Sequence, residues 1–190
     1  MAVNATPPTS SLPAALLDLI PNEAHRRWIV NLARHMSFLA DMIPADLLIY
    51  VPTADQRLLA IAEAKPTVRE SFYLRSQVGQ VIEAESASAL FTALKSGEIT
   101  PGALGKVVNG QPMSQIVYPL SHQGETCGVL VVERNLYEEL KHTEEKRQLY
   151  RTAIERGVLT LIAKARTCDI ALPSIQPGDG LLLINQSGVI

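Results

Sequence analysis

The chain has few of the residues on which several classes of protein depend. It holds two cysteines, Cys127 and Cys168, in 190 residues, which is too few for a disulfide framework and favours a reducing compartment. Aromatic residues make up 5% of the chain, with one tryptophan, so a platform for stacking nucleic-acid bases is not expected. A net charge of −2 provides no positive field for nucleic acid or an anionic membrane.

Segments typical of secretion or membrane insertion are also missing. Residues 1–12 carry no lysine or arginine, whereas a secretory signal starts with basic residues before an apolar run. The most apolar helical stretch, residues 154–165, contains three charged side chains, and a membrane span needs roughly 20 apolar residues. We therefore expect a cytoplasmic protein without a membrane segment.

Motifs for catalysis and metal binding are scarce. The sequence has no Gly-x-Ser-x-Gly elbow, P-loop or dinucleotide fingerprint, so we assign no catalytic residue and identify no cofactor. His25 and His35 would lie about 80° apart around a helix, which makes a poor metal pair. His25 is either a phosphoacceptor or a solvated helical residue. Cys127 is either a buried structural thiol or a redox or metal-binding one, and Cys168 has no CxxC partner.

What is present is an ordinary globular balance, 47% hydrophobic and 19% charged, with clear periodicity. Residues 1–12 are predicted to be a disordered lead. An apolar residue then recurs every three or four positions, as on one face of a helix: Trp28, Leu32, Met36, Leu39 and Ile43. Asn22 is placed to cap this helix and Pro44 to end it. Two β-favouring runs, 46–51 and 58–64, flank a turn signal and predict an antiparallel hairpin.

The middle of the chain predicts a strand and a short helix. Residues 67–74 are expected to form a third strand, at an edge because Pro66 precedes it. Residues 86–96 are expected to form a helix capped by Ser86 and ended by Gly97.

The rest of the chain predicts a loop, a second hairpin and a long helix. Residues 100–114 are rich in glycine and proline and are expected to be a loop. Residues 115–120 and 126–133 form the clearest strand pair. Residues 136–166 have an acidic start and a basic end, which match the dipole of one long helix.

Together these elements predict an α+β fold, an antiparallel sheet flanked by long N- and C-terminal helices. Both terminal helices would cover one face, and the short helix and long loop would enclose a cavity on the other. This order resembles the GAF family, a relative of PAS domains. Flanking helices in such modules often dimerise, so helices 13–43 and 136–166 either form a homodimer seam or simply cover their own sheet.

A ligand site is predicted beside the cavity. Arg69, Tyr73 and Arg75 are separated by even steps, which places them on one face of the expected strand. Two arginines and a tyrosine suit an anion such as phosphate or carboxylate, and Tyr118 could add a ring or a hydroxyl. Loop 97–114 would be the lid, because its glycines act as hinges. The alternative is a solvated edge strand that binds nothing.

Three segments give a closer resemblance: residues 39–51 (LADMIPADLLIYV), residues 117–132 (VYPLSHQGETCGVLVV), and the PGDG and NQSG turns within residues 177–188. They are similar to the N-terminal sensory domain of GAF–PAS two-component histidine kinases. The resemblance spans about residues 20–190. It implies a GAF-like domain over 13–170, followed at 171–190 by a linker and the first strands of a PAS domain.

The resemblance implies a regulatory input domain that signals through its flanking helices to PAS and kinase domains, and through them to a response regulator. A small-molecule ligand would be the signal. The sequence lacks a phosphoacceptor box, an ATP-binding Asn box and a glycine-rich nucleotide lid, so the family's kinase activity is not expected in this chain. The alternative function is a ligand-free structural dimerisation module.

Overall fold

The N-terminal helix forms as its apolar repeat predicts. The computed structural model describes residues 14–20, 22–122 and 124–166, and begins with α1 (Ala14–Leu17) and α2 (Glu23–Met42). The Asn22 side-chain oxygen accepts hydrogen bonds from the backbone N–H groups of Ala24 (2.9 Å) and His25 (3.3 Å), which confirms the predicted cap. The predicted apolar stripe is buried in full, so α2 is fastened to the sheet by that face.

A six-stranded antiparallel sheet forms the centre of the fold. Its spatial order is β3-β2-β1-β6-β5-β4, so β1 and β6 lie in the middle. The strands are β1 (Ala45–Pro52), β2 (Leu58–Ala64), β3 (Val81–Ile82), β4 (Thr100–Val108), β5 (Gln111–His122) and β6 (Glu125–Asn135). Both predicted hairpins, β1–β2 and β5–β6, are confirmed.

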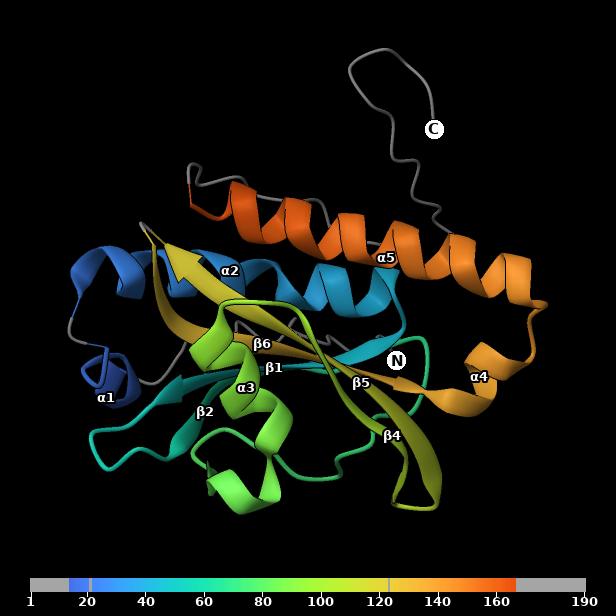
Figure 1. The fold of residues 1–190 in the computed structure, drawn as a ribbon, viewed down its shortest axis with the longest axis horizontal. Coiled ribbons are helices and arrows are strands. Elements are labelled where there is room, and N and C mark those ends of the chain that lie inside the picture. The colour runs from blue at the N-terminus through green and yellow to red at the C-terminus, as the bar shows by residue number, and fades with distance from the viewer. Residues whose placement is uncertain (1–13, 21, 123, 167–190) are drawn as a thin grey trace, which may run out of the picture.

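The sheet divides the core into two layers because successive side chains of a strand point to opposite faces. On β1, Leu47, Ile49 and Val51 pack with α2 and α5 (Glu144–Lys164), whereas Leu48 and Tyr50 pack with α3 (Ser88–Ser96). Figure 1 shows α2 and α5 on one side of the sheet and α3 on the other. The predicted α+β arrangement is therefore confirmed.

The loop predicted over residues 100–114 is wrong, because most of it is strand β4 and the start of β5. Pro101 and the glycines of β4 are tolerated since β4 is an edge strand, and two register shifts interrupt its pairing with β5. Asn109 and Gly110 have φ angles of 48° and 77° and form the tight turn between the strands. An Asn-Gly pair is the strongest short signal for such a hairpin.

The strand predicted over residues 67–74 is also wrong. This segment is irregular, and the third strand is the two-residue β3. Its polar groups bind Asp46 instead of a neighbouring strand. Asp46 accepts hydrogen bonds from the Ser71 hydroxyl (2.5 Å) and the Phe72 N–H (3.2 Å), while the Phe72 ring is fully buried.

The single helix predicted over residues 136–166 is two helices, α4 (Leu136–Leu140) and α5. Asn135 caps α4 by accepting from Tyr137 N–H (2.9 Å). Thr143, with an extended backbone, precedes the two glutamates that begin α5. The extended backbone of Thr143, whose side chain makes no cap hydrogen bond, interrupts the longer helix, and the two glutamates suit the start of a new one.

The short helix α3 begins and ends close to its prediction. A 3₁₀ turn (Ala84–Ser86) precedes it, and Ser86 donates to the Glu83 carbonyl oxygen (2.9 Å) instead of capping α3, so the predicted cap is wrong. Gly97 ends α3 in the left-handed conformation (φ 69°), as predicted. The lead at 1–12 and the strands at 180–190 lie outside the described residues. None of the helices within the described ranges has the length and apolarity of a membrane span.

Candidate functional site

A cavity of about 550 Å³ lies between the sheet and α3. Its walls come from the start of α3, the edge strand β4, the segment from the end of β2 to β3, and the face of β1, β5 and β6 that points away from α2. The lining residues include Tyr50, Tyr73, Ala87, Leu90, Ala103, Lys106, Gln115 and Glu133. This position agrees with the enclosed space predicted on the α3 side, with strand β4 in place of a loop.

Glu133 is the buried charged group of this cavity, with 3% of its surface exposed. Its Oε1 accepts a hydrogen bond from the Gln115 amide nitrogen (2.8 Å), and the Gln115 oxygen accepts from Ala103 N–H (3.3 Å). The Glu133 Oε2 atom has no hydrogen-bond partner among the described residues. Burial raises the pKa of Glu133, against the stabilising effect of the Tyr73 and Gln115 side chains.

Two tyrosines stand beside this carboxyl group. Burial, and then the charge of Glu133, raises the pKa values of both Tyr50 and Tyr73. Both phenols therefore stay protonated at neutral pH and offer a hydroxyl and a ring face. The cavity thus combines a buried acid, an oriented amide and two aromatic side chains.

Arg69, one of the four predicted site residues, makes structural contacts within the fold. Its guanidinium pairs with Asp46 (2.8 Å) and donates to the backbone oxygens of Pro44 (2.8 Å) and Glu133 (3.2 Å). It borders a different hollow of about 570 Å³, between the end of α2, α4 and α5. The guanidinium also stacks over the Phe72 ring at 4.8 Å.

The other three predicted residues lie in three different environments. Tyr73 lines the cavity under α3, and Arg75 is exposed in the loop before β3. Tyr118 is buried in the core on the α2 side of the sheet, and burial raises its pKa to about 12. The structure therefore does not bring the four residues together. It places Glu133 and Gln115, which sequence reasoning missed, beside Tyr73. The sequence signal for Glu133 was its position as a charged residue at the end of the apolar run of β6.

The opposite face of the sheet carries a second polar network around Glu139 of α4, which is 8% exposed. Glu139 Oε1 accepts from the Ser114 hydroxyl (2.6 Å) and pairs with Arg134 (2.9 Å), while Oε2 lies 3.8 Å from Arg151 of α5. Burial lowers the pKa of Arg134, and the charge of Glu139 opposes that effect. The network joins β5, β6, α4 and α5.

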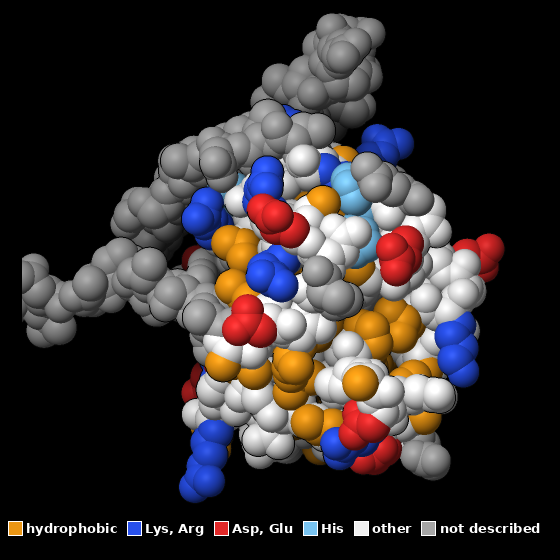
Figure 2. Space-filling view, turned by 90° about the vertical axis from the view of Figure 1, so that its left-hand side faces the viewer, with side chains coloured by type: hydrophobic (Ala, Val, Ile, Leu, Met, Phe, Trp, Pro, Cys, Tyr) orange, Lys and Arg blue, Asp and Glu red, His pale blue; other side chains and the backbone are white. Residues whose placement is uncertain are grey.

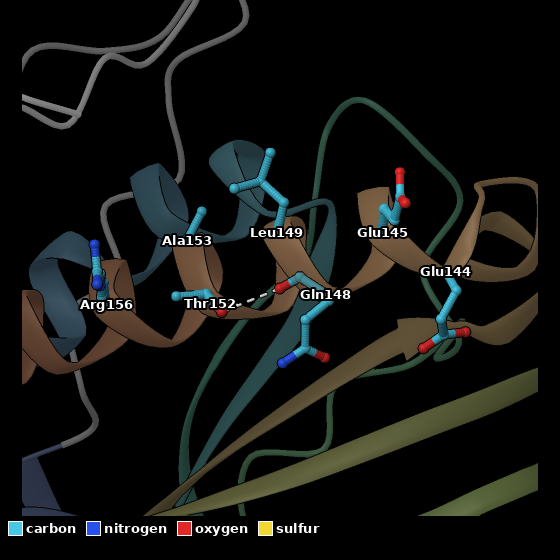
Figure 3. Close-up of a pocket in the computed structure, with 7 residues that line it drawn as sticks. All are labelled: Glu144, Glu145, Gln148, Leu149, Thr152, Ala153 and Arg156. Carbon is cyan, nitrogen blue, oxygen red and sulfur yellow. Dashed lines mark hydrogen bonds between the residues drawn. The ribbon is translucent and has the colours of Figure 1, made fainter.

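A further hollow, of about 780 Å³, runs along the outer face of α5. Its described lining residues all come from this one helix, and Figure 3 shows their side chains along it. They include Glu145, Leu149, Thr152, Ala153 and Arg156.

Histidine side chains gather where α2 begins, at the end of the molecule seen in Figure 2. The His25 ring lies 5.7 Å from the His122 ring, and the Arg166 guanidinium lies 4.8 Å above the Trp28 ring. His25 is buried, so the expectation of a solvated histidine is wrong. Among the residues that the structure describes, no three His, Cys, Asp or Glu side chains meet in a metal-binding group.

Cys127 is half-buried in β6, where its thiol donates to the Leu120 carbonyl oxygen (3.3 Å). Burial raises the pKa of this thiol to about 11. A protonated thiol is a poor nucleophile and metal ligand, which favours the structural interpretation. Cys168 lies outside the described residues.

Comparison with protein families and solved structures agrees with this fold. The family model "Histidine kinase PdtaS, GAF domain" matches residues 19–153. No curated protein matches the chain.

Among solved structures, the sensor region of a sensor histidine kinase is similar, with a TM-score of 0.55 and 19% identity over 79% of this chain and 49% of that one. The chain thus spans about half the length of that protein. The second GAF domain of DevS from Mycobacterium smegmatis matches with a TM-score of 0.43 and 15% identity, over 72% of this chain and 94% of that one.

Proposed function

The chain belongs to the family of the GAF domain of the histidine kinase PdtaS, and from that premise we propose that it is the signal-input domain of a cytoplasmic two-component system. The matched region is a GAF domain alone, so the parent family's kinase activity is not assigned to these residues. In this proposal the sensory domain spans residues 13–170, and residues 171–190 lead into a PAS domain. Kinase domains and a response regulator act downstream.

The main support for this proposal is the cavity under α3. A chain of polar contacts leads from the wall of this cavity to α5. Glu133 lines the cavity, and the next residue of β6, Arg134, belongs to the Glu139 network that reaches Arg151 of α5. A ligand changes the pose of α5 only if it binds one pose more tightly than another. The route supplies a physical means for that difference in affinity.

Ligand binding is tested by a thermal-shift screen of this chain against nucleotides, cyclic dinucleotides and common metabolites. A true ligand raises the melting temperature in proportion to the logarithm of its excess over Kd. The matched variant is Ala103→Phe, which fills the cavity from β4. We expect a stabiliser of the natural chain that has no effect on this variant. A cavity that no compound occupies would remove the sensing role.

A homodimer through helices 13–43 and 136–166 is the second part of the proposal. Leu149 of α5 is 70% exposed, and Tyr137 and Leu140 of α4 are also exposed. Exposed apolar side chains on a helix commonly mark a surface that another helix covers. Light scattering should give the mass of a dimer, and Leu149→Lys should shift it toward a monomer.

The control for this test is Leu104→Lys on edge strand β4, since Leu104 is 73% exposed. It adds the same charge at a leucine of similar exposure away from the helices, and should leave the dimer intact. A protein that is monomeric at all concentrations would contradict a homodimer through these helices. A dimer that binds no compound would instead favour a ligand-free structural dimerisation module.

A further inference from the structure

Three polar side chains form one row across the sheet on the wall of the cavity. Glu133 of β6 is paired in register with Asp46 of β1 on one side and with Gln115 of β5 on the other. All three side chains point to the α3 face, since strand residues in register share a face. Two acids therefore lie side by side in the buried sheet.

The two carboxylates differ in the hydrogen-bond donors that surround them. Asp46 pairs with the Arg69 guanidinium and also accepts from Ser71 and Phe72. The Glu133 carboxylate receives the Gln115 amide on Oε1, while Oε2 is buried with no donor in full hydrogen-bond geometry among the described residues. The Tyr73 hydroxyl lies close enough to oppose the rise in the Glu133 pKa. Arg69 reaches Glu133 at its backbone oxygen. A buried carboxylate oxygen without a donor is costly, so it marks a place where a ligand can supply one.

We infer that the cavity recognises a cationic nitrogen donor, such as an amidinium, guanidinium or ammonium group, through the Glu133 carboxylate. This inference rests on the proposed ligand-binding function and reverses the sign of the ligand predicted from the sequence. The Tyr50 and Tyr73 side chains supply ring faces and hydroxyl groups beside the carboxylate, and such rings attract cations. Lys106 also lines the cavity and its charge acts on Glu133, but its side chain is exposed to water, which weakens that effect.

The test uses two probes of nearly the same shape and opposite charge, benzamidinium chloride and sodium benzoate. Each is titrated at pH 8 into the ¹⁵N-labelled chain, because the raised pKa of Glu133 favours its protonated form at lower pH. The backbone amides of Leu90 and Ala103 report on the cavity. We expect saturable shifts with benzamidinium and none with benzoate. Glu133→Gln should weaken benzamidinium binding by at least about tenfold, since it removes a charge-assisted hydrogen bond. Lys106→Ala should tighten it slightly.

The control variant is Glu138→Gln, at an exposed carboxylate of α4, which should leave binding unchanged. Preference for benzoate, or equal benzamidinium binding by Glu133→Gln, would overturn the inference and leave the cavity as a ligand site. Absence of binding by both probes would also overturn it. The proposed function itself fails only if the wider screen finds no ligand that Ala103→Phe excludes, so the two failures are distinguishable.

Discussion

Glu133 and Arg134 are consecutive residues of β6, and their side chains lie on opposite faces of the sheet. Glu133 lines the cavity under α3, and Arg134 pairs with Glu139 on the side of α4 and α5. β5 repeats the relationship, because Gln115 binds Glu133 while the preceding residue, Ser114, binds Glu139. A shift of the β5–β6 pair caused from the cavity is therefore felt directly under α5.

Glu139→Gln should destabilise the domain. The substitution leaves the Arg134 guanidinium, only 19% exposed in its side chain, without its carboxylate. Loss of one partner of such a pair costs about 3 kcal/mol, which urea unfolding measures. Glu138→Gln is the control, because Glu138 pairs with Lys141 at the surface and should cost less than about 1 kcal/mol. Equal effects of the two variants would contradict a central role for Glu139.

Glu133→Gln should stabilise the domain at high pH. Because burial raises the Glu133 pKa above its ordinary value of 4.5, the folded chain holds a proton that the unfolded chain releases between the two pKa values. The stability from this group is full below pH 4.5 and is lost as the pH rises through the folded-state pKa. Relative to the natural chain, the variant should gain about 1–3 kcal/mol at pH 8.

The measurement for Glu133→Gln is urea unfolding of both proteins at pH 4.5, 6 and 8. The gain should be near zero at pH 4.5 and increase with pH. Groups shared by both proteins, such as Asp55, whose pKa the Arg57 and Thr53 hydrogen bonds lower to about 2, cancel in the difference. Glu125→Gln, at an exposed position of β6, should show no such trend. Parallel stability curves for Glu133→Gln would refute the prediction.

Asp46→Asn should loosen the segment between β2 and β3. Asp46 is fully buried and holds Arg69, Ser71 and the Phe72 N–H. Loss of its charge leaves the Arg69 guanidinium uncompensated, at a cost of about 3 kcal/mol. Trypsin should then cleave faster after Arg69 and Arg75. Glu70→Gln, in the same segment but exposed, should leave the cleavage rate unchanged, and an unchanged rate in Asp46→Asn would be the contrary result.

The regular recurrence of apolar residues was sufficient to predict the helix and the strands that bury one continuous face. The stripe from Trp28 to Ile43 and the two apolar hairpins are local patterns, and each forms where it was predicted. Strand β4 was missed because its glycines and prolines are signals for a loop, although they also suit an interrupted edge strand. The Asn109–Gly110 pair was the local sequence signal for the β4–β5 hairpin.

The candidate site was harder to predict because long-range register creates it. Arg69 and Tyr73 were grouped by even spacing, but Asp46 binds Arg69 and curls the segment away from a strand. Tyr118 lies on the other face, as alternation along β5 requires. The row of Asp46, Glu133 and Gln115 depends on strands that are distant in sequence, and no local pattern specifies that pairing.

Trp28→Phe should release the C-terminal end of α5. The indole Nε1 donates to the Ile162 carbonyl oxygen (3.1 Å) in the last turn of α5, where helix carbonyl groups in general lack intrahelical donors. Phenylalanine keeps a ring but removes this donor, so we expect a loss of about 2 kcal/mol and faster hydrogen exchange at residues 158–165. Tyr150→Phe, at an exposed ring in the first half of α5, is the control and should change neither quantity. Unaltered exchange at residues 158–165 in Trp28→Phe would show that apolar packing of Val158 and Ile162 alone fastens this end of the helix.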